Sequence, residues 1–278
     1  MSTTATLLTC PLDKSPLTKR DNGYRCANNH HFDIAKEGYV NLLPAHHKRS
    51  KQPGDNKAMV QARRQFLDTN WYQAISDLLN STVSQTLDTS RTNNLLDAGC
   101  GEGYYLARLV EHCDKEINAY GLDISKFAVA AAAKKYKALN WLVASNRQIP
   151  LADSSLDSII CAFGFPCYQE FSEKLKPTGK LFLMETQEQH LIELRQLIYP
   201  ELKAYKPLDL TPAENANFVL EDKQSLQQSI TLDKQAISQL LAMTPHLYRA
   251  PKEGIAKVEA LSTLTLTLDV ALYQFGRC

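Results

Sequence analysis

The stretch best suited to ligand chemistry is residues 95–105, in which a short apolar run gives way to alternating glycines directly after Asp97. This pattern predicts a buried strand, a tight turn and a helix start, because glycine lets the backbone approach a ligand without a Cβ atom in the way. The spacing differs from the Gly-x-Gly-x-x-Gly of dinucleotide enzymes, whose helix N-terminus holds a pyrophosphate. We therefore expect a nucleoside cofactor without phosphates, bound by a turn that contains Gly99, Gly101 and Gly103.

A second apolar strand is expected to end at Asp123, 20 positions beyond Gly103. A carboxylate at that place can accept hydrogen bonds from both hydroxyls of a ribose. Together the two segments resemble the S-adenosylmethionine site of class I methyltransferases, in which the equivalent of Asp97 lies beside the methionine moiety. A lone glycine turn could be an ordinary tight loop, but an acid at this distance favours the cofactor.

The elements that would position this site alternate between helix and strand patterns. Ser125 is expected to cap an alanine-rich helix that crosses to the next parallel strand. Helices are expected over residues 71–79, 125–138 and 190–205, and strands over 141–144, 158–162, 181–185, 217–229 and 262–275. The predicted class is α/β, a class I Rossmann-like methyltransferase sheet that is mostly parallel with an antiparallel last strand, preceded by a small zinc-ribbon-like module.

The N-terminal segment holds a possible metal site, made of Cys10, Asp13, Cys26 and His30. Their separation is that of a small zinc ribbon with two ligands on each of two knuckles, and Asn22-Gly23 between them suits a hairpin turn. A second thiolate is normally found three residues after the first, where this chain has a carboxylate, which can also bind zinc. The alternative is a hairpin without metal, held by the packing of Leu7, Tyr24 and Phe32.

Positive charge is concentrated near the N-terminus. Residues 1–64 contain eleven basic and five acidic residues, a net charge of +6, whereas the whole chain of 278 residues carries +1. A charge excess is often only a solvated face, but beside a possible zinc ribbon it suits contacts with RNA phosphates. We predict three regions: a zinc-ribbon-like RNA-binding module over residues 1–45, a basic linker and helix over 46–70, and a methyltransferase domain over 71–278.

Four segments resemble the 23S ribosomal RNA (guanine-N1)-methyltransferase family of the RlmA or RrmA type, and the similarity extends over nearly the entire chain. The segments are residues 36–44, 47–55, 61–64 and 95–105. That family carries Cys-x-x-Cys and Cys-x-x-x-His in the knuckle, so Cys10, Cys26 and His30 match and Asp13 departs. The resemblance implies methyl transfer from S-adenosylmethionine to N1 of a specific guanine in a 23S rRNA hairpin.

The resemblance also assigns Tyr72 and His190 to the cofactor, although the residue types alone would indicate a core aromatic and a structural histidine. Ser145 follows the third strand, where many class I methyltransferases bind the adenine amino group. The expected cofactor site consists of Tyr72, Asp97, Gly99, Gly101, Glu102, Gly103, Tyr104, Asp123, Ile124, Ser145 and His190.

The loop after the fourth strand is expected to meet the methyl acceptor, because ligands of open α/β sheets bind outside the carboxyl ends of the strands. Phe163, Phe165 and Tyr168 could stack on an extruded base, or some of them could close the core beneath the cofactor. By the resemblance, Pro166 and Cys167 form the pocket wall. No Asp, Glu or His stands out as the base that removes the N1 proton, so the catalytic residue stays unassigned.

Composition narrows the remaining possibilities. No apolar stretch approaches the roughly 20 residues needed to span a bilayer, and the N-terminus lacks the features of a secretory signal. We expect a cytoplasmic protein without disulfides, despite its seven cysteines, with 23S rRNA as partner and a homodimer as a further possibility. The alternative functions are a small-molecule S-adenosylmethionine-dependent methyltransferase and an RNA-binding module that has lost catalysis.

Overall fold

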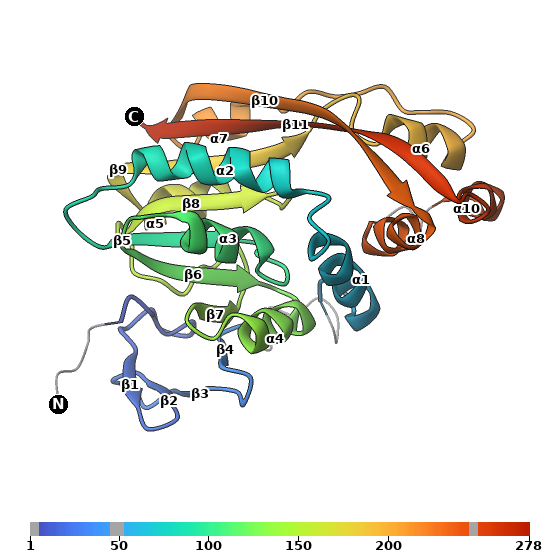
Figure 1. Cartoon of the computed structure of the whole chain (residues 1–278). Coiled ribbons are helices and arrows are strands. Elements are labelled where there is room, and N and C mark those ends of the chain that lie inside the picture. The colour runs from blue at the N-terminus through green and yellow to red at the C-terminus, as the bar shows by residue number, and fades with distance from the viewer. Residues whose placement is uncertain (1–5, 45–52, 245–249) are drawn as a thin grey trace.

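An eight-stranded sheet forms the centre of the computed structural model, which describes residues 6–44, 53–244 and 250–278. The strand order is β10-β11-β9-β8-β5-β6-β7-β4 (Figure 1). The strands are β4 (Tyr39–Asn41), β5 (Asn93–Ala98), β6 (Ile117–Asp123), β7 (Asn140–Val143), β8 (Leu156–Ala162), β9 (Leu175–Thr186), β10 (Phe218–Asp233) and β11 (Thr263–Arg277). Residues 47–50, part of the basic segment noted above, lie outside the described residues.

Parallel pairing joins β4 through β9, whereas β11 runs antiparallel to both β9 and β10. The predicted mostly parallel sheet with an antiparallel last strand is therefore confirmed. The carboxyl ends of β5, β6, β8 and β9 meet at one edge of the sheet, which is where ligands bind in such folds.

Apolar side chains form two clusters, one on each face of the sheet. Figure 1 shows α2 and α3 on one face, with α1, α8 and α10 beyond the carboxyl ends of the parallel strands. The cluster on the other face includes side chains from α5, α7 and the N-terminal segment. The helices are α1 (Lys57–Leu67), α2 (Gln73–Thr86), α3 (Tyr104–His112), α4 (Lys126–Lys135), α5 (Tyr168–Lys174), α6 (Ile192–Ile198), α7 (Thr211–Glu214), α8 (Lys234–Met243) and α10 (Lys252–Glu259).

Helix α6 differs from the sequence expectation because it ends at Ile198, whereas a helix to about Tyr205 was predicted. Residues 199–210 continue without helix or strand before α7. This segment contains two prolines, Pro200 and Pro207, and proline disfavours helical backbone at the residue that precedes it. The segment instead passes along the ligand edge of the sheet.

The N-terminal module is a three-stranded antiparallel sheet formed by β1 (Thr18–Arg20), β2 (Gly23–Arg25) and β3 (His31–Asp33). It packs against the main sheet, where Leu8 pairs with Leu151 and Gln148 Nε2 donates to the carbonyl oxygen of Pro11 at 2.7 Å. Strand β4 extends the main sheet by pairing with β7. Residues 39–41 thus belong to the central sheet, although the predicted boundary at residue 45 places them in the N-terminal module.

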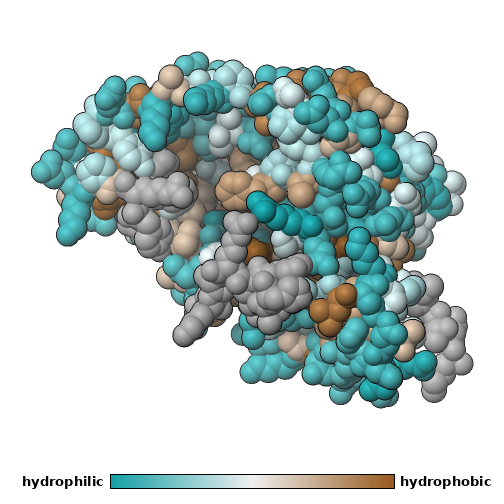
Figure 2. Space-filling model, turned by 180° about the vertical axis from the view of Figure 1, so that it is seen from behind, coloured by the Kyte–Doolittle hydropathy of each residue, from teal (hydrophilic) through white to brown (hydrophobic). Residues whose placement is uncertain are grey.

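The surface agrees with this division between core and exterior. Figure 2 shows a mainly hydrophilic face with apolar side chains in small separate patches. Among the described residues, no helix is both long enough and apolar enough to cross a bilayer.

Candidate cofactor and substrate site

A cavity of about 1400 Å³ lies at the carboxyl ends of the parallel strands, and the glycine turn between β5 and α3 forms part of its wall. All three glycines have positive φ, at 96° for Gly99, 55° for Gly101 and 84° for Gly103. A Cβ atom at Gly99 or Gly101 would meet no atom closer than 3.9 or 3.8 Å and would project into the cavity, whereas one at Gly103 would lie 2.4 Å from the Trp141 ring. The first two glycines leave room for a ligand, and the third allows close packing.

Two buried acids lie at this turn without hydrogen-bond partners among the described residues. They are both oxygens of Asp97, which is 1% exposed, and Oε2 of Glu102. Burial, followed by the negative charges of Asp123 and Glu102, raises the pKa of Asp97 to about 8. Burial also raises the pKa of Glu102 to about 7, although the nearby charge of Arg63 opposes that rise. Two unpaired acids in one buried place favour a cationic ligand.

Asp123 fixes the turn from the neighbouring strand β6. Its Oδ2 accepts the N–H of Gly101 at 3.0 Å and its Oδ1 accepts the N–H of Ser125 at 2.7 Å. Ser125 also caps α4, as predicted, and its Oγ donates to the carbonyl oxygen of Asp55 at 2.7 Å. The chain before α1 therefore packs directly over the end of β6.

His190 lies among aromatic rings at the end of β9. Its ring stacks on Phe163 with centroids 6.4 Å apart and approaches Tyr72 at 6.3 Å. Its Nδ1 accepts the backbone N–H of Asp269 at 3.2 Å, which places the proton of the neutral ring on Nε2. In this tautomer Nε2 is a donor, so His190 is not arranged to remove a proton from a ligand.

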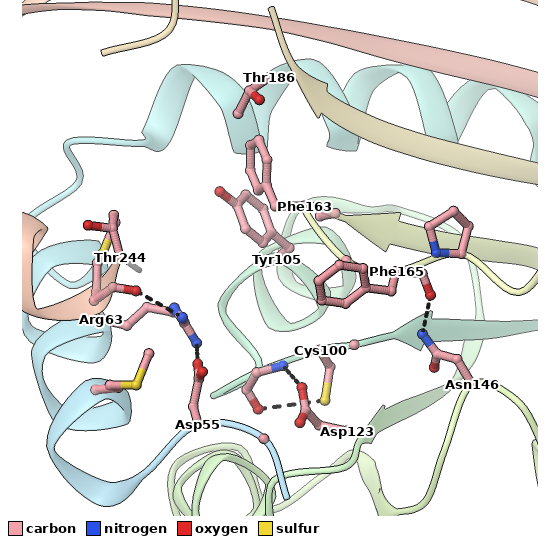
Figure 3. Close-up of a pocket in the computed structure, with 18 of the residues that line it drawn as sticks. Asp55, Arg63, Cys100, Tyr105, Asp123, Asn146, Phe163, Phe165, Thr186 and Thr244 are labelled. Atoms are coloured by element: carbon pink, nitrogen blue, oxygen red, sulfur yellow. Dashed lines mark hydrogen bonds and ion pairs between the residues drawn. The ribbon is translucent and has the colours of Figure 1, made fainter. Parts of the chain in front are cut away.

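The loop after β8 presents its aromatic side chains to the same cavity (Figure 3). Phe163 has a φ of 55°, an unusual conformation for a bulky residue that is often found at functional sites. Phe165 is 91% exposed, and its carbonyl oxygen accepts a hydrogen bond from Asn146 Nδ2 at 3.2 Å. Pro166 and Cys167 also line the cavity. Tyr168 does not, because its ring packs edge-on against Phe218 at 6.4 Å.

Most of the residues expected at the cofactor line this cavity: Tyr72, Gly99, Gly101, Glu102, Asp123, Ile124, Ser145 and His190. Asp97 and Gly103 lie just beneath the wall. Tyr104 is directed away from the cavity and packs under Arg108, whose Cζ lies 5.7 Å from the ring centroid, while Tyr105 occupies the wall instead. The cofactor contact expected of Tyr104 is thus better placed for Tyr105.

Sequence reasoning did not identify two further groups of lining residues. Met59, Arg63 and Leu67 of α1 line the cavity, and their spacing of four residues is a signal of one helix face. Arg195, Lys203, Tyr205 and Lys206 line it from α6 and the segment that follows. That second group carries no local motif that could have identified it.

The N-terminal module brings together the four predicted metal ligands. Their donor atoms all lie within 4.8 Å of one another. His30 Nδ1 lies 3.4 Å from each cysteine sulfur and 3.1 Å from Asp13 Oδ2, and Cys26 Sγ lies 3.6 Å from the same oxygen. Zinc bonds of 2.0–2.3 Å give tetrahedral edges of about 3.3–3.8 Å. The four donors therefore fit a tetrahedral zinc ion.

Comparison with known proteins assigns both parts of the chain. Residues 8–51 match a zinc-ribbon family described as "RlmA, N-terminal", and residues 95–179 match a family described as "Methyltransferase domain". YxjB of Bacillus subtilis, which carries the name of a 23S rRNA (guanine-N1)-methyltransferase, is 30% identical over 268 residues, and the alignment covers 94% of each chain. The chain belongs to the 23S rRNA (guanine-N1)-methyltransferase family.

Two further similarities agree with this family. The 23S rRNA (guanine(748)-N(1))-methyltransferase of Streptomyces fradiae is 29% identical over 252 residues, covering 90% of this chain and 89% of the relative. The crystal structure of YcgJ from Bacillus subtilis aligns with a TM-score of 0.50 at 17% identity, over 72% of this chain and 98% of that one, and supports the fold alone.

The residues of this methyltransferase fit its cofactor, S-adenosylmethionine. The turn leaves space that a Cβ atom at Gly99 or Gly101 would fill, and the unpaired acids Asp97 and Glu102 suit the ammonium group of the methionine moiety. Asp123 retains lone pairs for the ribose hydroxyls beyond the two backbone hydrogen bonds that it accepts.

Substitution of Asp13 tests the metal site of this family member. We expect Asp13→Cys to retain zinc at a chelator concentration at least about tenfold higher than the unmodified protein tolerates, because thiolate is the softer ligand. Asp13→Ala should release zinc more readily than the unmodified protein. Elemental analysis after dialysis measures the zinc content. Asp33→Ala, at an exposed position in the same module, should leave zinc unchanged, and equal zinc retention by all three variants would contradict a role for Asp13.

Proposed function

We propose that this protein transfers a methyl group from S-adenosylmethionine to N1 of a specific guanine in a 23S rRNA hairpin. The proposal is supported by the full-length similarity to relatives that are named for this reaction. When bound, the cofactor supplies an activated methyl group on its sulfonium. The task left to the protein is to place the guanine in line with that group and to exclude water.

The distribution of charge around the cavity supports an RNA substrate. Strand β8, which carries the acceptor loop, lies between β5 and β9 in the sheet. On the β5 side the cavity is lined by acids suited to the cofactor. On the β9 side its charged lining residues are Arg195, Lys203 and Lys206, none of which forms an ion pair with another described residue. Unpaired cations beside the acceptor loop suit the phosphates that flank a target nucleotide.

The size of the cavity and its aromatic residues support capture of a base. Its volume of about 1400 Å³ exceeds the roughly 300–1,000 Å³ of ordinary ligand pockets, so there is room for cofactor and base together. Guanine N1 lies on the Watson–Crick edge, so the base must be unpaired or extruded before reaction. Phe165, exposed at the mouth, can stack on such a base, an interaction worth about 1–3 kcal/mol.

A direct assay tests the proposal. Purified protein, labelled S-adenosylmethionine and a 23S rRNA hairpin transcript should give 1-methylguanine, whereas the same transcript with the target guanine replaced should not. Methylation of a small metabolite while the transcript stays unmodified would instead establish a small-molecule methyltransferase. A cytoplasmic location and a homodimer also remain proposals, the first because ribosomal RNA is expected there.

Removing the cations beside β9 should weaken RNA binding in a defined way. For Lys203→Gln combined with Lys206→Gln, we expect the slope of log Kobs against log[salt] to become shallower by about 0.7–0.9 for each phosphate that the protein no longer neutralises. Filter binding of the hairpin between 50 and 200 mM salt measures it, as an experimental range of about a factor of four. Lys137→Gln, exposed and outside the cavity lining, is the matched control. An unchanged slope in the double variant would show that the RNA does not pass this segment.

A further inference from the structure

Arg63 occupies a distinctive place in the wall of the cavity. It lies on the face of α1 that also presents Met59 and Leu67, and its side chain is 27% exposed. One guanidinium nitrogen, Nη1, donates to Asp55 Oδ2, and the other, Nη2, donates to the carbonyl oxygen of Met243 at 3.1 Å (Figure 3). The guanidinium is therefore held by two segments distant in the sequence, one before α1 and one at the end of α8.

This guanidinium is directed at the glycine turn. The nearest atom to a Cβ built on Gly101 is Arg63 Nη1, at 3.8 Å. The cavity-lining acids around it are Asp55, Glu102 and Asp123, and Arg63 is the cation whose charge opposes the rise in pKa of both Glu102 and Asp123. Among the described residues that line this end of the cavity, Arg63 is thus the cation within a group of carboxylates.

The methionine end of S-adenosylmethionine carries an ammonium and a carboxylate on one carbon atom. The acids at the turn attract the ammonium, but the same acids repel a carboxylate held next to it. A guanidinium has five N–H donors, and Asp55 and Met243 use two of those of Arg63. The remaining donors can bind a carboxylate in the charge-assisted geometry that arginine favours.

We propose that Arg63 is the counter-ion of the cofactor's α-carboxylate and makes the site selective for a donor that carries this group. The inference rests on S-adenosylmethionine being the methyl donor and does not depend on the RNA substrate. Arg63 also joins α1 to α8, so binding of the carboxylate would stabilise the closed arrangement of these two helices over the cavity.

Two ligands and two variants test this assignment by calorimetric binding without catalysis. The ligands are S-adenosylmethionine and decarboxylated S-adenosylmethionine, which lacks only the carboxylate. For the unmodified protein we expect roughly 10- to 100-fold weaker binding of the decarboxylated ligand. Arg63→Gln should weaken binding of S-adenosylmethionine by a similar factor and leave the decarboxylated ligand nearly unaffected, so that the ratio of the two affinities approaches one.

The matched control is Arg64→Gln, because Arg64 is the next residue of α1 and pairs with Asp68 at 3.7 Å outside the cavity. It should keep the discrimination of the unmodified protein. The affinity ratio is measured on one folded population, so lower stability of a variant does not imitate the effect. If Arg63→Gln does not fold, Arg63→Lys should give an intermediate ratio, because lysine keeps the charge and loses the fork.

Equal weakening of both ligands by the Arg63 substitution would overturn the assignment, as would an unmodified protein that binds both ligands equally. Failure of the unmodified protein to bind S-adenosylmethionine at all would contradict the methyl donor itself. Failure to methylate the rRNA hairpin, with discrimination between the two ligands intact, would contradict only the proposed substrate.

Discussion

Asp97→Asn is expected to abolish most methyl transfer and at the same time to stabilise the protein in the absence of cofactor. The carboxylate is buried without a hydrogen-bond partner among the described residues. Loss of one partner of a buried ion pair costs about 3–5 kcal/mol, so the affinity for S-adenosylmethionine should fall roughly 10²- to 10³-fold if Asp97 faces the cofactor's ammonium. Radiolabel transfer and calorimetric binding measure these losses.

The stability effect of this variant has a defined pH dependence. Folding raises the pKa of Asp97 from 3.8 to about 8, mainly because of burial. Below about pH 4 the carboxyl group is neutral in both the folded and the unfolded states. As the pH rises to about 8, the unfolded state loses this proton first, so the unmodified protein loses stability relative to the neutral variant. Thermal melts without cofactor should differ little near pH 4.5 and by about 5 °C or more at pH 8.5.

Glu102→Gln is the matched comparison for this experiment. Its pKa is raised only to about 7, because the charge of Arg63 opposes the effect of burial. We therefore expect a smaller gain in melting temperature that is complete at a lower pH. A melting temperature for Asp97→Asn that matches the unmodified protein at both pH values would show that Asp97 is not strained by its burial.

Gly121→Ala is expected to cause a large loss of stability. Gly121 of β6 pairs in register with Trp141 of β7, and an added Cβ would lie 2.2 Å from the buried indole ring. The same ring lies beneath Gly103 of the cofactor turn. Forcing a methyl group into such a packed place costs about 3 kcal/mol, which corresponds to roughly 6–12 °C in melting temperature. Thermal denaturation measures this change.

Two controls separate this packing effect from loss of function. In a Trp141→Leu background the Gly121→Ala substitution should cost less, because the ring atoms that it meets are gone. Gly99→Ala should fold with a milder loss, since its Cβ would meet no atom within 3.9 Å, yet it should bind the cofactor poorly because that Cβ enters the cavity. A Gly121→Ala protein that melts within about 2 °C of the unmodified one would contradict the role assigned to Trp141.

The glycine turn, the acid at Asp123 and the sheet type could be predicted because their signals are local. Glycines at fixed spacing, and an acid at the end of an apolar strand, act through the backbone geometry of one strand-turn-helix unit. The metal ligands were equally accessible, because Cys10, Asp13, Cys26 and His30 stand at knuckle spacing on either side of a hairpin.

Other features depend on packing between distant segments. Tyr104 and Tyr105 are adjacent at the start of α3, and which of them faces the cavity depends on the rotation of the helix, about 100° per residue. Arg63 reaches the turn only because α1 packs between α8 and α4. The pairing of β4 with β7 likewise arises from tertiary contacts, so the sequence did not indicate that the N-terminal segment completes the central sheet.

The most direct test of the proposed reaction is mass spectrometry of 23S rRNA fragments from cells with and without this gene. The account predicts one fragment that carries 1-methylguanine in the parent, lacks the methyl group in the deletion strain, and regains it on complementation with the unmodified gene but not with the Asp97→Asn variant. A 23S rRNA that has the same methylation in parent and deletion strains would contradict it.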